Sequence, residues 1–183
     1  INDVIRKLKK VDSKLDVREG SILDLKFDDC YFDIVLAFGL YHNFHSENLE
    51  KSIKETYRVL KIGGKVCASF RADNIQERII DFINYKPDSK QKEFHKLNLT
   101  KNEFKNLLEK NNFKVEKIFS VQNMPFLYKF KFFRSKKHKI FNENKGRTEG
   151  YKLSKIGKFV QNFLIKFFPD SFCNIYLIIG VKK

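Results

Sequence analysis

The chain has 183 residues, 42% of them hydrophobic, and a formal net charge of +15. This length suffices for one globular domain with a sizeable core and leaves little room for a second. The three cysteines are widely spaced and form no C-x-x-C pair, so we expect no disulfide framework, no bound metal and a reducing, cytoplasmic location. The apolar runs are far shorter than the roughly 18–20 residues that span a bilayer, so we expect no transmembrane segment.

The positive charge comes mainly from lysine, because only 7 of the 37 basic residues are arginine. Recognition of phosphates and bases relies strongly on the planar guanidinium group of arginine. We therefore interpret most of the charge as a solvated surface, and nucleic acid as the less favoured partner.

Two short elements and a loop are expected in the first thirty residues. Apolar residues at helical spacing predict an amphipathic helix over Asp3–Lys10, and Leu15–Arg18 is a candidate strand. The polar segment Gly20–Asp29 predicts a loop. Phe32–Phe38 then follows, apolar on both faces after its first polar residue, which is typical of a parallel strand covered by helices on both sides.

The middle of the chain alternates between helix and strand patterns. Glu47–Leu60 has helical spacing, and we expect Gly63 and Gly64 to end that helix before a strand over Lys65–Phe70. Asn74–Tyr85 is the next predicted helix. This alternation favours an α/β domain with a largely parallel sheet.

A capping box marks the start of the next helix. Thr100 and Glu103 have the spacing in which each side chain accepts from the other residue's main-chain amide. We expect this helix to end at Asn111–Asn112 and to precede the strand Phe113–Val121. The last predicted strand is Asn174–Val181.

The long segment Gln122–Phe172 separates the last two predicted strands and concentrates the charge. From residue 126 to residue 168, twelve Lys and Arg stand against two Glu. The aromatic residues of Phe126–Arg134 have a spacing that suits either a helix or a strand face. Further on, a helical stripe predicts either a core helix or a helix lying in a membrane interface, and its members are Ile156, Phe159, Val160, Phe163 and Phe167.

Four pieces of the sequence, in this order, resemble the second half of the class I S-adenosylmethionine-dependent methyltransferases. Gly20–Phe27, with Phe32–Val35 after it, resembles the segment G-D-A-x-x-L-P-F and the F-D-x-V of that family's fourth strand. Ala37–His42 resembles the active-site loop after that strand. Tyr57–Lys65 resembles the motif R-V-L-K-P-G-G, and Leu99–Phe113 resembles the segment around the helix before the sixth strand.

The resemblance implies a Rossmann-like, doubly wound, mostly parallel sheet with an antiparallel last strand. The sequence contains no G-x-G-x-G turn, so we interpret the chain as N-terminally truncated and residues 1–183 as one partial methyltransferase domain. The basic, aromatic segment at about 122–172 is then an insertion between the last two strands. Because strands 1 and 2 of the family are missing, the candidate strand Leu15–Arg18 is expected to lack a neighbour.

The same resemblance implies that S-adenosyl-L-methionine is the cofactor. Carried over position by position, Ser21 and Ile22 border the adenine, and the main chain of Ala37, Phe38 and Gly39 borders the methionine portion. Ser21 replaces the acidic residue that usually binds the adenine amino group. Glu19 or Asp24 is the candidate substitute for that acidic residue.

The intact protein is accordingly expected to transfer a methyl group to a small-molecule acceptor. Candidate substrate contacts are Tyr41, His42 and His45, with Arg71 and Asp73 as weaker ones. His42 is the candidate general base, because a histidine at this position can take a proton from an attacking hydroxyl or amine. We expect the basic insertion to cover the site, which favours an anionic or amphipathic acceptor.

Three alternatives stay open at this stage. The lysine-aromatic segment also suits a nucleic-acid-binding module, whose aromatics stack on bases. A catalytically inactive methyltransferase-like protein would carry the same motifs. Finally, the Phe-rich helix also suits a peripheral membrane enzyme.

Overall fold

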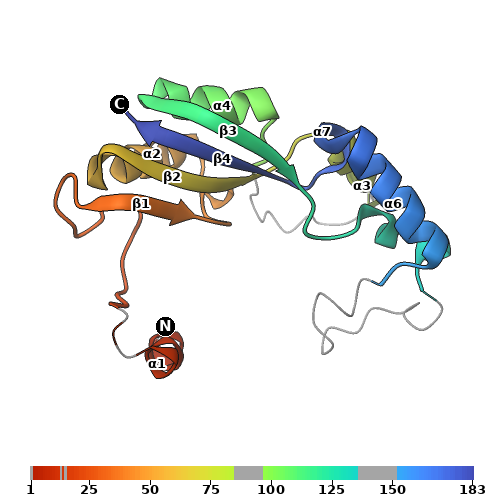
Figure 1. Cartoon of the computed structure of the whole chain (residues 1–183), viewed down its shortest axis with the longest axis horizontal. Helices are drawn as coiled ribbons and strands as arrows, with labels where there is room; N and C mark the ends of the chain where they lie inside the picture. Colours follow the sequence, from red (N-terminus) through yellow and green to blue (C-terminus); the bar gives the residue numbers. More distant parts are fainter. Residues whose placement is uncertain (1, 13, 15, 85–96, 136–151) are drawn as a thin grey trace.

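The computed structural model describes residues 2–12, 14, 16–84, 97–135 and 152–183. Among these residues, four strands form one sheet in the order β1-β2-β4-β3 (Figure 1). β1 (Phe32–Ala37) runs parallel to β2 (Leu60–Arg71), whereas β4 (Ile175–Lys182) runs antiparallel to both β2 and β3 (Phe113–Val121). The sheet is therefore parallel except for β4, which confirms the predicted topology.

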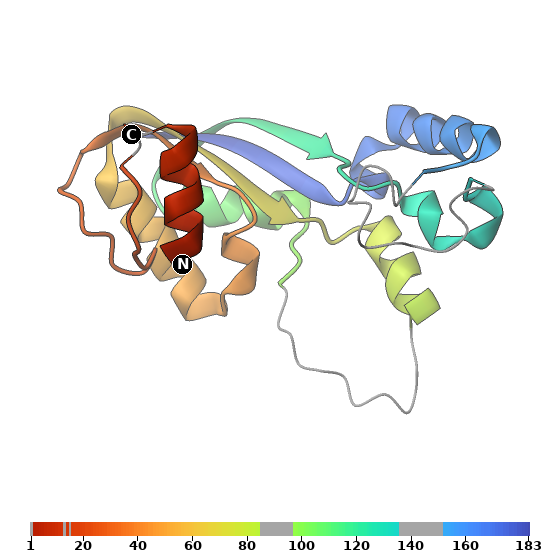
Figure 2. The same ribbon diagram turned by 90° about the horizontal axis from the view of Figure 1, so that it is seen from below.

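Two helices cover one face of this sheet. α2 (Ser46–Val59) and α4 (Lys101–Lys110) lie on the same side, as Figure 2 shows. The main core lies between these helices and the sheet, where its largest buried side chains include Phe70, Phe104 and Ile178. Burial of such side chains is the main force that holds helices onto a sheet.

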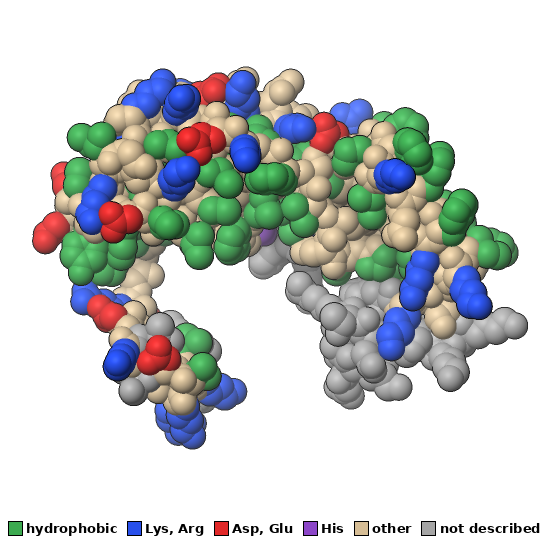
Figure 3. Space-filling view, viewed as in Figure 1, with side chains coloured by type: hydrophobic (Ala, Val, Ile, Leu, Met, Phe, Trp, Pro, Cys, Tyr) green, Lys and Arg blue, Asp and Glu red, His purple; other side chains and the backbone are tan. Residues whose placement is uncertain are grey.

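The opposite face of the sheet stays uncovered by the described residues. On β1, Ile34 is 62% exposed and Leu36 is 64% exposed. Hydrophobic side chains are accordingly visible across the sheet in Figure 3. The expectation of helices on both faces is therefore wrong for the described residues, in which β1 is also an edge strand of the sheet.

The chain passes from α2 into β2 without the predicted break. α2 ends at Val59 because Leu60 has an extended backbone and already belongs to β2. Phe32 of β1 pairs with Leu60, but Ile34 pairs with Lys65, so extra residues of β2 bulge out between these two pairs. Gly63, with a φ of 76°, lies in this bulge. The glycines thus kink a strand rather than terminate a helix.

The start of the chain contains a helix but no strand. α1 (Asn2–Val11) confirms the first predicted helix and stands apart from the sheet in Figure 1. Residues 16–18 are not a strand, and Leu15 lies outside the described residues. The sequence led us to expect that this segment lacks a neighbouring strand. Without a hydrogen-bonding neighbour, nothing stabilises an extended backbone.

Arg58, near the end of α2, holds the loop that precedes β1. Its guanidinium donates to the carbonyl oxygens of Leu25 and Phe27, each at 2.8 Å, and to a carboxylate oxygen of Asp29 at 2.7 Å. It also pairs with Glu55 one turn earlier on the same helix, at 3.0 Å. The arginine of the R-V-L motif therefore has a structural role here.

The predicted capping box and strand limits are confirmed around α4. The Thr100 side chain accepts from the Glu103 amide, and the Glu103 carboxylate accepts from the Thr100 amide. Asn112, with a φ of 66°, takes the left-handed conformation that follows the helix. β3 then begins at Phe113, as predicted.

A second, smaller cluster packs beyond the carboxyl ends of the parallel strands (Figures 1 and 2). It comprises α3 (Ile75–Asn84), two 3-10 turns, η2 (Phe126–Lys129) and η3 (Lys131–Phe133), and the helices α6 (Lys155–Phe167) and α7 (Pro169–Phe172). The structure thus resolves the ambiguous Phe126–Arg134 pattern into turns. Residues 85–96 and 136–151, including the end of the predicted Asn74–Tyr85 helix, lie outside the described residues.

The apolar stripe predicted for α6 does not form the side of that helix that packs into the protein. Val160 and Leu164 pack into the small cluster, whereas Ile156, Phe159, Phe163 and Phe167 are largely exposed. The core-helix interpretation of this stripe is therefore wrong for four of its five members. No helix in the described parts of the chain is long and apolar enough to cross a membrane.

Candidate active site

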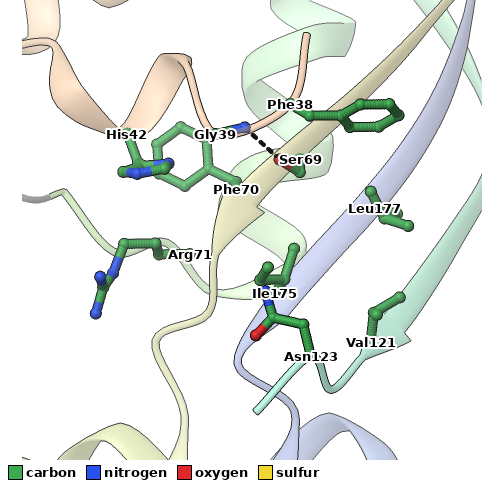
Figure 4. Close-up of a pocket in the computed structure, with 10 residues that line it drawn as sticks. All are labelled: Phe38, Gly39, His42, Ser69, Phe70, Arg71, Val121, Asn123, Ile175 and Leu177. Atoms are coloured by element: carbon green, nitrogen blue, oxygen red, sulfur yellow. Dashed lines mark hydrogen bonds between the residues drawn. The ribbon is translucent and has the colours of Figure 1, made fainter. Parts of the chain in front are cut away.

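A cavity of about 420 Å³ lies where β1, β2 and β3 end and β4 begins. It opens on the sheet face that none of the described helices covers, and Figure 4 shows its lining residues. Its lining residues are Phe38, Gly39, His42, Ser69, Phe70, Arg71, Val121, Asn123, Ile175 and Leu177. In doubly wound sheets, ligands bind at the carboxyl ends of the parallel strands, and this cavity lies at that edge.

The loop after β1 is fixed in place at the cavity wall. The Gly39 amide donates to the hydroxyl oxygen of Ser69 on β2 at 2.8 Å, the contact drawn as a dashed line in Figure 4. The Asn43 side chain donates to the carbonyl oxygens of Gly39 and Leu40 at 2.9 and 3.0 Å. Gly39 has a φ of 66°, a conformation that glycine adopts without strain.

Arg71, at the end of β2, supplies a positive charge to the cavity wall. Its Nε donates to the side-chain oxygen of Asn98 at 3.1 Å, and its guanidinium lies 3.7 Å from the Glu77 carboxylate. Burial raises the pKa of Glu77, while the nearby Arg71 charge opposes that rise. These two partners hold the guanidinium at one side of the cavity.

His42 lies on the same side of the cavity as Arg71 in Figure 4, away from Val121 and Leu177. The residue belongs to the short 3-10 helix η1 (Tyr41–Asn43), and its ring meets Phe70 edge-on, with centroids 6.2 Å apart. Its carbonyl oxygen accepts from the Leu97 amide at 3.0 Å. His42 and Arg71, both expected to contact substrate, are therefore brought together at one cavity.

Tyr41 does not share this cavity, which corrects its expected role. Its side chain is fully buried and its hydroxyl lies 2.7 Å from the hydroxyl oxygen of Thr56 on α2. Burial raises the pKa of Tyr41 to about 12. The position after β1 points this side chain into the core, so Tyr41 anchors the loop.

The expected cofactor residues do not all meet in one place. Phe38 and Gly39 line the cavity, whereas Ala37 is buried behind it at 3% exposure. Ser21 and Ile22 lie in a turn closed by the bridge between Ser21 and Asp24, outside the cavity lining.

Two further substrate candidates, His45 and Asp73, also lie outside this cavity. His45 is the residue that precedes α2, at its N-cap position. Asp73 lines a separate hollow of about 360 Å³, together with Asn74 and Arg78. Of the described residues of segment 122–172, Asn123 is the one in the cavity lining, so the described insertion lies beside the cavity rather than over it.

Sequence reasoning missed several lining residues. Ser69 is the polar residue in the otherwise apolar run from Val66 to Phe70, near the end of β2, and this signal pointed to the edge of the sheet where the cavity lies. Asn123 follows the end of β3 in the same way. Ile175 and Leu177 lie on β4, and their place at the site depends on the antiparallel pairing of β4 with β2 and β3.

Comparison with known proteins gives matches to methyltransferases. Residues 2–68 match the family described as "Methyltransferase domain". A protein of Encephalitozoon cuniculi named "Putative methyltransferase" is 44% identical over 48 residues, which is 26% of this chain and 23% of that protein. The aligned part is thus about a quarter of the length of this curated relative.

Solved structures agree on the fold across nearly the whole chain. The S-adenosylmethionine-dependent methyltransferase of Methanosarcina mazei superposes with a TM-score of 0.57 at 14% identity, over 100% of this chain and 78% of that one. An S-adenosylmethionine-dependent methyltransferase of Archaeoglobus fulgidus gives a TM-score of 0.56 at 18% identity, over 96% of this chain and 71% of that one. The protein thus has the Rossmann-like fold of the class I methyltransferases.

Proposed function

We propose that this chain is part of an S-adenosylmethionine-dependent methyltransferase that acts on a small-molecule acceptor. The hydrogen bond between Gly39 and Ser69 carries the proposal, because it joins the family's active-site loop to the neighbouring strand at the edge where such sheets bind ligands. The match of residues 2–68 to the methyltransferase domain family includes this loop.

The residues at the cavity fit one end of S-adenosylmethionine. A Cβ atom built at Gly39 would meet no atom within 4 Å, so the main chain there is open to a ligand. Phe38, Ile175 and Leu177 provide an apolar wall beside it. Ser21 and Ile22, proposed for the adenine, lie outside this cavity, and the sequence has no G-x-G-x-G turn. We therefore expect this chain alone to bind the cofactor weakly.

When bound, the cofactor supplies an electrophilic methyl group, so the protein needs no nucleophile of its own. The loop at Phe38 and Gly39 orients the methyl donor, and the held positions of His42 and Arg71 orient the acceptor on the other side. The imidazole of His42 takes the proton that a hydroxyl or amine acceptor loses on methylation. The guanidinium of Arg71 attracts an acceptor with a negative group.

The size and lining of the cavity support a small acceptor. Its volume of about 420 Å³ is within the range of small-molecule sites. The lining is largely apolar, with Arg71 as its cationic member. An anionic or amphipathic small molecule matches this combination.

Isothermal titration with S-adenosylmethionine tests the proposal, run on this chain and on the natural full-length protein. We expect binding by the full-length protein and much weaker binding by this chain. Micromolar affinity of this chain alone would contradict the expected weakness. If neither protein bound the cofactor, the similarity to methyltransferases would extend to the fold only, and the proposed activity would be wrong.

A variant of the full-length protein tests the location of the site. Phe38→Ala removes an aromatic side chain from the cavity wall and should weaken cofactor binding by about tenfold. Phe119→Ala is the matched control, since Phe119 is also an exposed phenylalanine at the end of a strand but lies outside the lining. Equal effects of the two substitutions would place the cofactor elsewhere.

A further inference from the structure

One face of α6 exposes an apolar stripe to solvent. Ile156, Phe159, Phe163 and Phe167 are 61%, 72%, 48% and 57% exposed. Their spacing of three, four and four residues puts them on one side of the helix, over about 16 Å at 1.5 Å per residue. We call these four residues the α6 stripe.

The helix behind this stripe is well anchored. Gly157 and Gln161 are buried on its inner side, and the Gln161 side-chain oxygen accepts from the Leu127 amide at 2.9 Å. The Ser154 hydroxyl caps the helix by accepting from the Gly157 amide at 3.1 Å. The stripe is therefore a rigid surface. Among the described residues, its side chains belong to neither core cluster, and Phe163 and Phe167 contact each other with ring centroids 4.8 Å apart.

Basic residues flank the stripe, and α6 contains no acidic residue. Lys155, Lys158 and Lys166 are exposed on the same helix. At 100° per residue, Lys155 and Lys166 lie directly beside the edge of the stripe formed by Phe159. Figure 3 shows lysine and arginine side chains next to hydrophobic ones over this part of the molecule.

We propose that the α6 stripe docks onto the surface of an anionic lipid bilayer. Phenylalanine and isoleucine side chains of a surface helix enter the boundary between headgroups and acyl chains, while flanking lysines reach the anionic headgroups. Each basic residue near such a surface adds to the electrostatic attraction. The helix has 13 residues, fewer than the roughly 18–20 needed to span the bilayer, so it lies along the surface.

The pattern favours lipid over two other occupants. A second copy of the chain, docked through the same face, would bring the lysines of the two α6 helices together, and like charges repel. A nucleic acid would be held mainly through phosphate contacts, whereas here four adjacent side chains form a continuous apolar strip that includes the aliphatic Ile156. This inference rests on the surface of α6 and is independent of the proposed methyl transfer.

Vesicle sedimentation tests the docking, using phosphatidylcholine vesicles with and without phosphatidylserine. We expect the chain to sediment with the anionic vesicles and to stay in solution with phosphatidylcholine alone. The double variant Phe159→Ser/Phe163→Ser should lower the affinity by at least about tenfold. Both side chains are exposed, so the fold should persist, which circular dichroism checks.

A second pair of variants tests how much the lysines of α6 contribute to vesicle binding. Replacing Lys155, Lys158 and Lys166 by glutamine should weaken binding to anionic vesicles, and added salt should weaken the parent in the same way. The triple variant of Lys51, Lys114 and Lys117 to glutamine removes the same charge from exposed positions on α2 and β3 and should bind like the parent. Ile62→Ser/Phe119→Ser is the control for the Phe159→Ser/Phe163→Ser variant, since Ile62 and Phe119 are exposed but lie outside α6.

Four results would overturn the proposal. One is parental binding by the Phe159→Ser/Phe163→Ser variant, and another is equal binding to neutral and anionic vesicles. A dimer in analytical ultracentrifugation that this variant dissociates would make the stripe a contact between copies. Salt-sensitive binding of single-stranded RNA that the variant loses, without vesicle binding, would make it a nucleic-acid surface.

Discussion

Arg58 ties a loop to a helix through a single guanidinium group. Its donors satisfy two main-chain carbonyls, at Leu25 and Phe27, and two carboxylates, at Asp29 and Glu55. The pairing with these carboxylates raises the pKa of Arg58, and hydrogen bonding to Arg58 lowers the pKa of Glu55. The loop therefore depends on one side chain that lies 29 to 33 residues further along the chain.

Arg58→Gln should lower the free energy of unfolding by on the order of 2 kcal/mol, because several partly buried acceptors lose a donor. Because the folded pKa of Glu55 is depressed, its stabilisation is present above the unfolded value of 4.5 and is lost as pH falls through the folded pKa. The variant should show a smaller loss of stability in that acidic window. Urea denaturation across this pH range measures both effects.

Arg78→Gln serves as the control for this prediction. Arg78 is 74% exposed at its side chain and lies 3.8 Å from Asp73, so its removal should change stability little. An equal loss in both variants would show that the Arg58 contacts contribute no more than a surface ion pair.

Gly39 gives a second prediction at the residue scale. Gly39→Ala should destabilise the protein by about 1–2 kcal/mol, because an alanine resists the left-handed backbone even where space is open. Gly20→Ala is the matched control, since Gly20 also has open space but no positive φ. Denaturant midpoints compare the two variants, and a stable Gly39→Ala protein would refute the strain argument.

At the scale of single elements, α4 illustrates how local chemistry sets a boundary. The reciprocal hydrogen bonds of Thr100 and Glu103 satisfy amides that the first turn leaves free. Hydrogen bonds from the Thr100 amide and hydroxyl lower the pKa of Glu103. The buried Phe104 and Leu108 then follow on the inner face of the helix.

Thr100→Ala should cost about 1 kcal/mol of stability, because the Glu103 amide loses its acceptor. Thr100→Ser retains the hydroxyl and should stay close to the parent. Thermal denaturation of the two variants measures the difference, and equal melting temperatures for the alanine and serine variants would contradict the capping role.

α6 and the α2–β2 junction show where element-scale patterns mislead. The α6 stripe has helical spacing, yet it faces outward because Gly157 and Gln161 mark the inner side. Helical periodicity in a sequence predicts that a helix has a distinct apolar face. It does not predict whether that face packs against the rest of the protein. Likewise, Gly63 and Gly64 signal a bend, and only the pairing with β1 shows that the bend lies inside a strand.

For the whole molecule, the uncovered sheet face is the dominant feature. Ile34 and Leu36 are exposed on β1, an edge strand among the described residues. Such a surface promotes association with other apolar or unpaired strand surfaces. We propose that residues 1–183 form one partial domain with an insertion at 122–172, whose uncovered face belongs to its interior in the full-length protein.

Ile34→Thr/Leu36→Thr should reduce self-association of this chain while changing its stability by no more than about 0.5 kcal/mol, because both side chains are exposed. Light scattering against protein concentration measures the association. Val11→Thr/Ile62→Thr removes comparable apolar surface from scattered exposed positions and should leave it unchanged. Equal effects would show that total exposed apolar area matters more than the sheet edge.

The order of α1, β1, α2, β2, α3, α4, β3 and β4, the limits of β3 and the α4 capping box follow from the sequence alone. These features depend on spacing and hydrogen bonding between residues close in the chain, which the sequence displays directly. The resemblance to the methyltransferases also singled out the loop at Phe38 and Gly39, and these two residues line the cavity.

The tertiary structure decided what lies together at the cavity and what lies apart. It buried Tyr41, left Ser21 and Ile22 outside, and brought in Ser69, Asn123 and Leu177 from segments distant in the sequence. It also turned the α6 stripe toward solvent. The reason is physical: the direction of a side chain follows from its element, but what that side chain meets depends on which elements pair and pack across the whole chain.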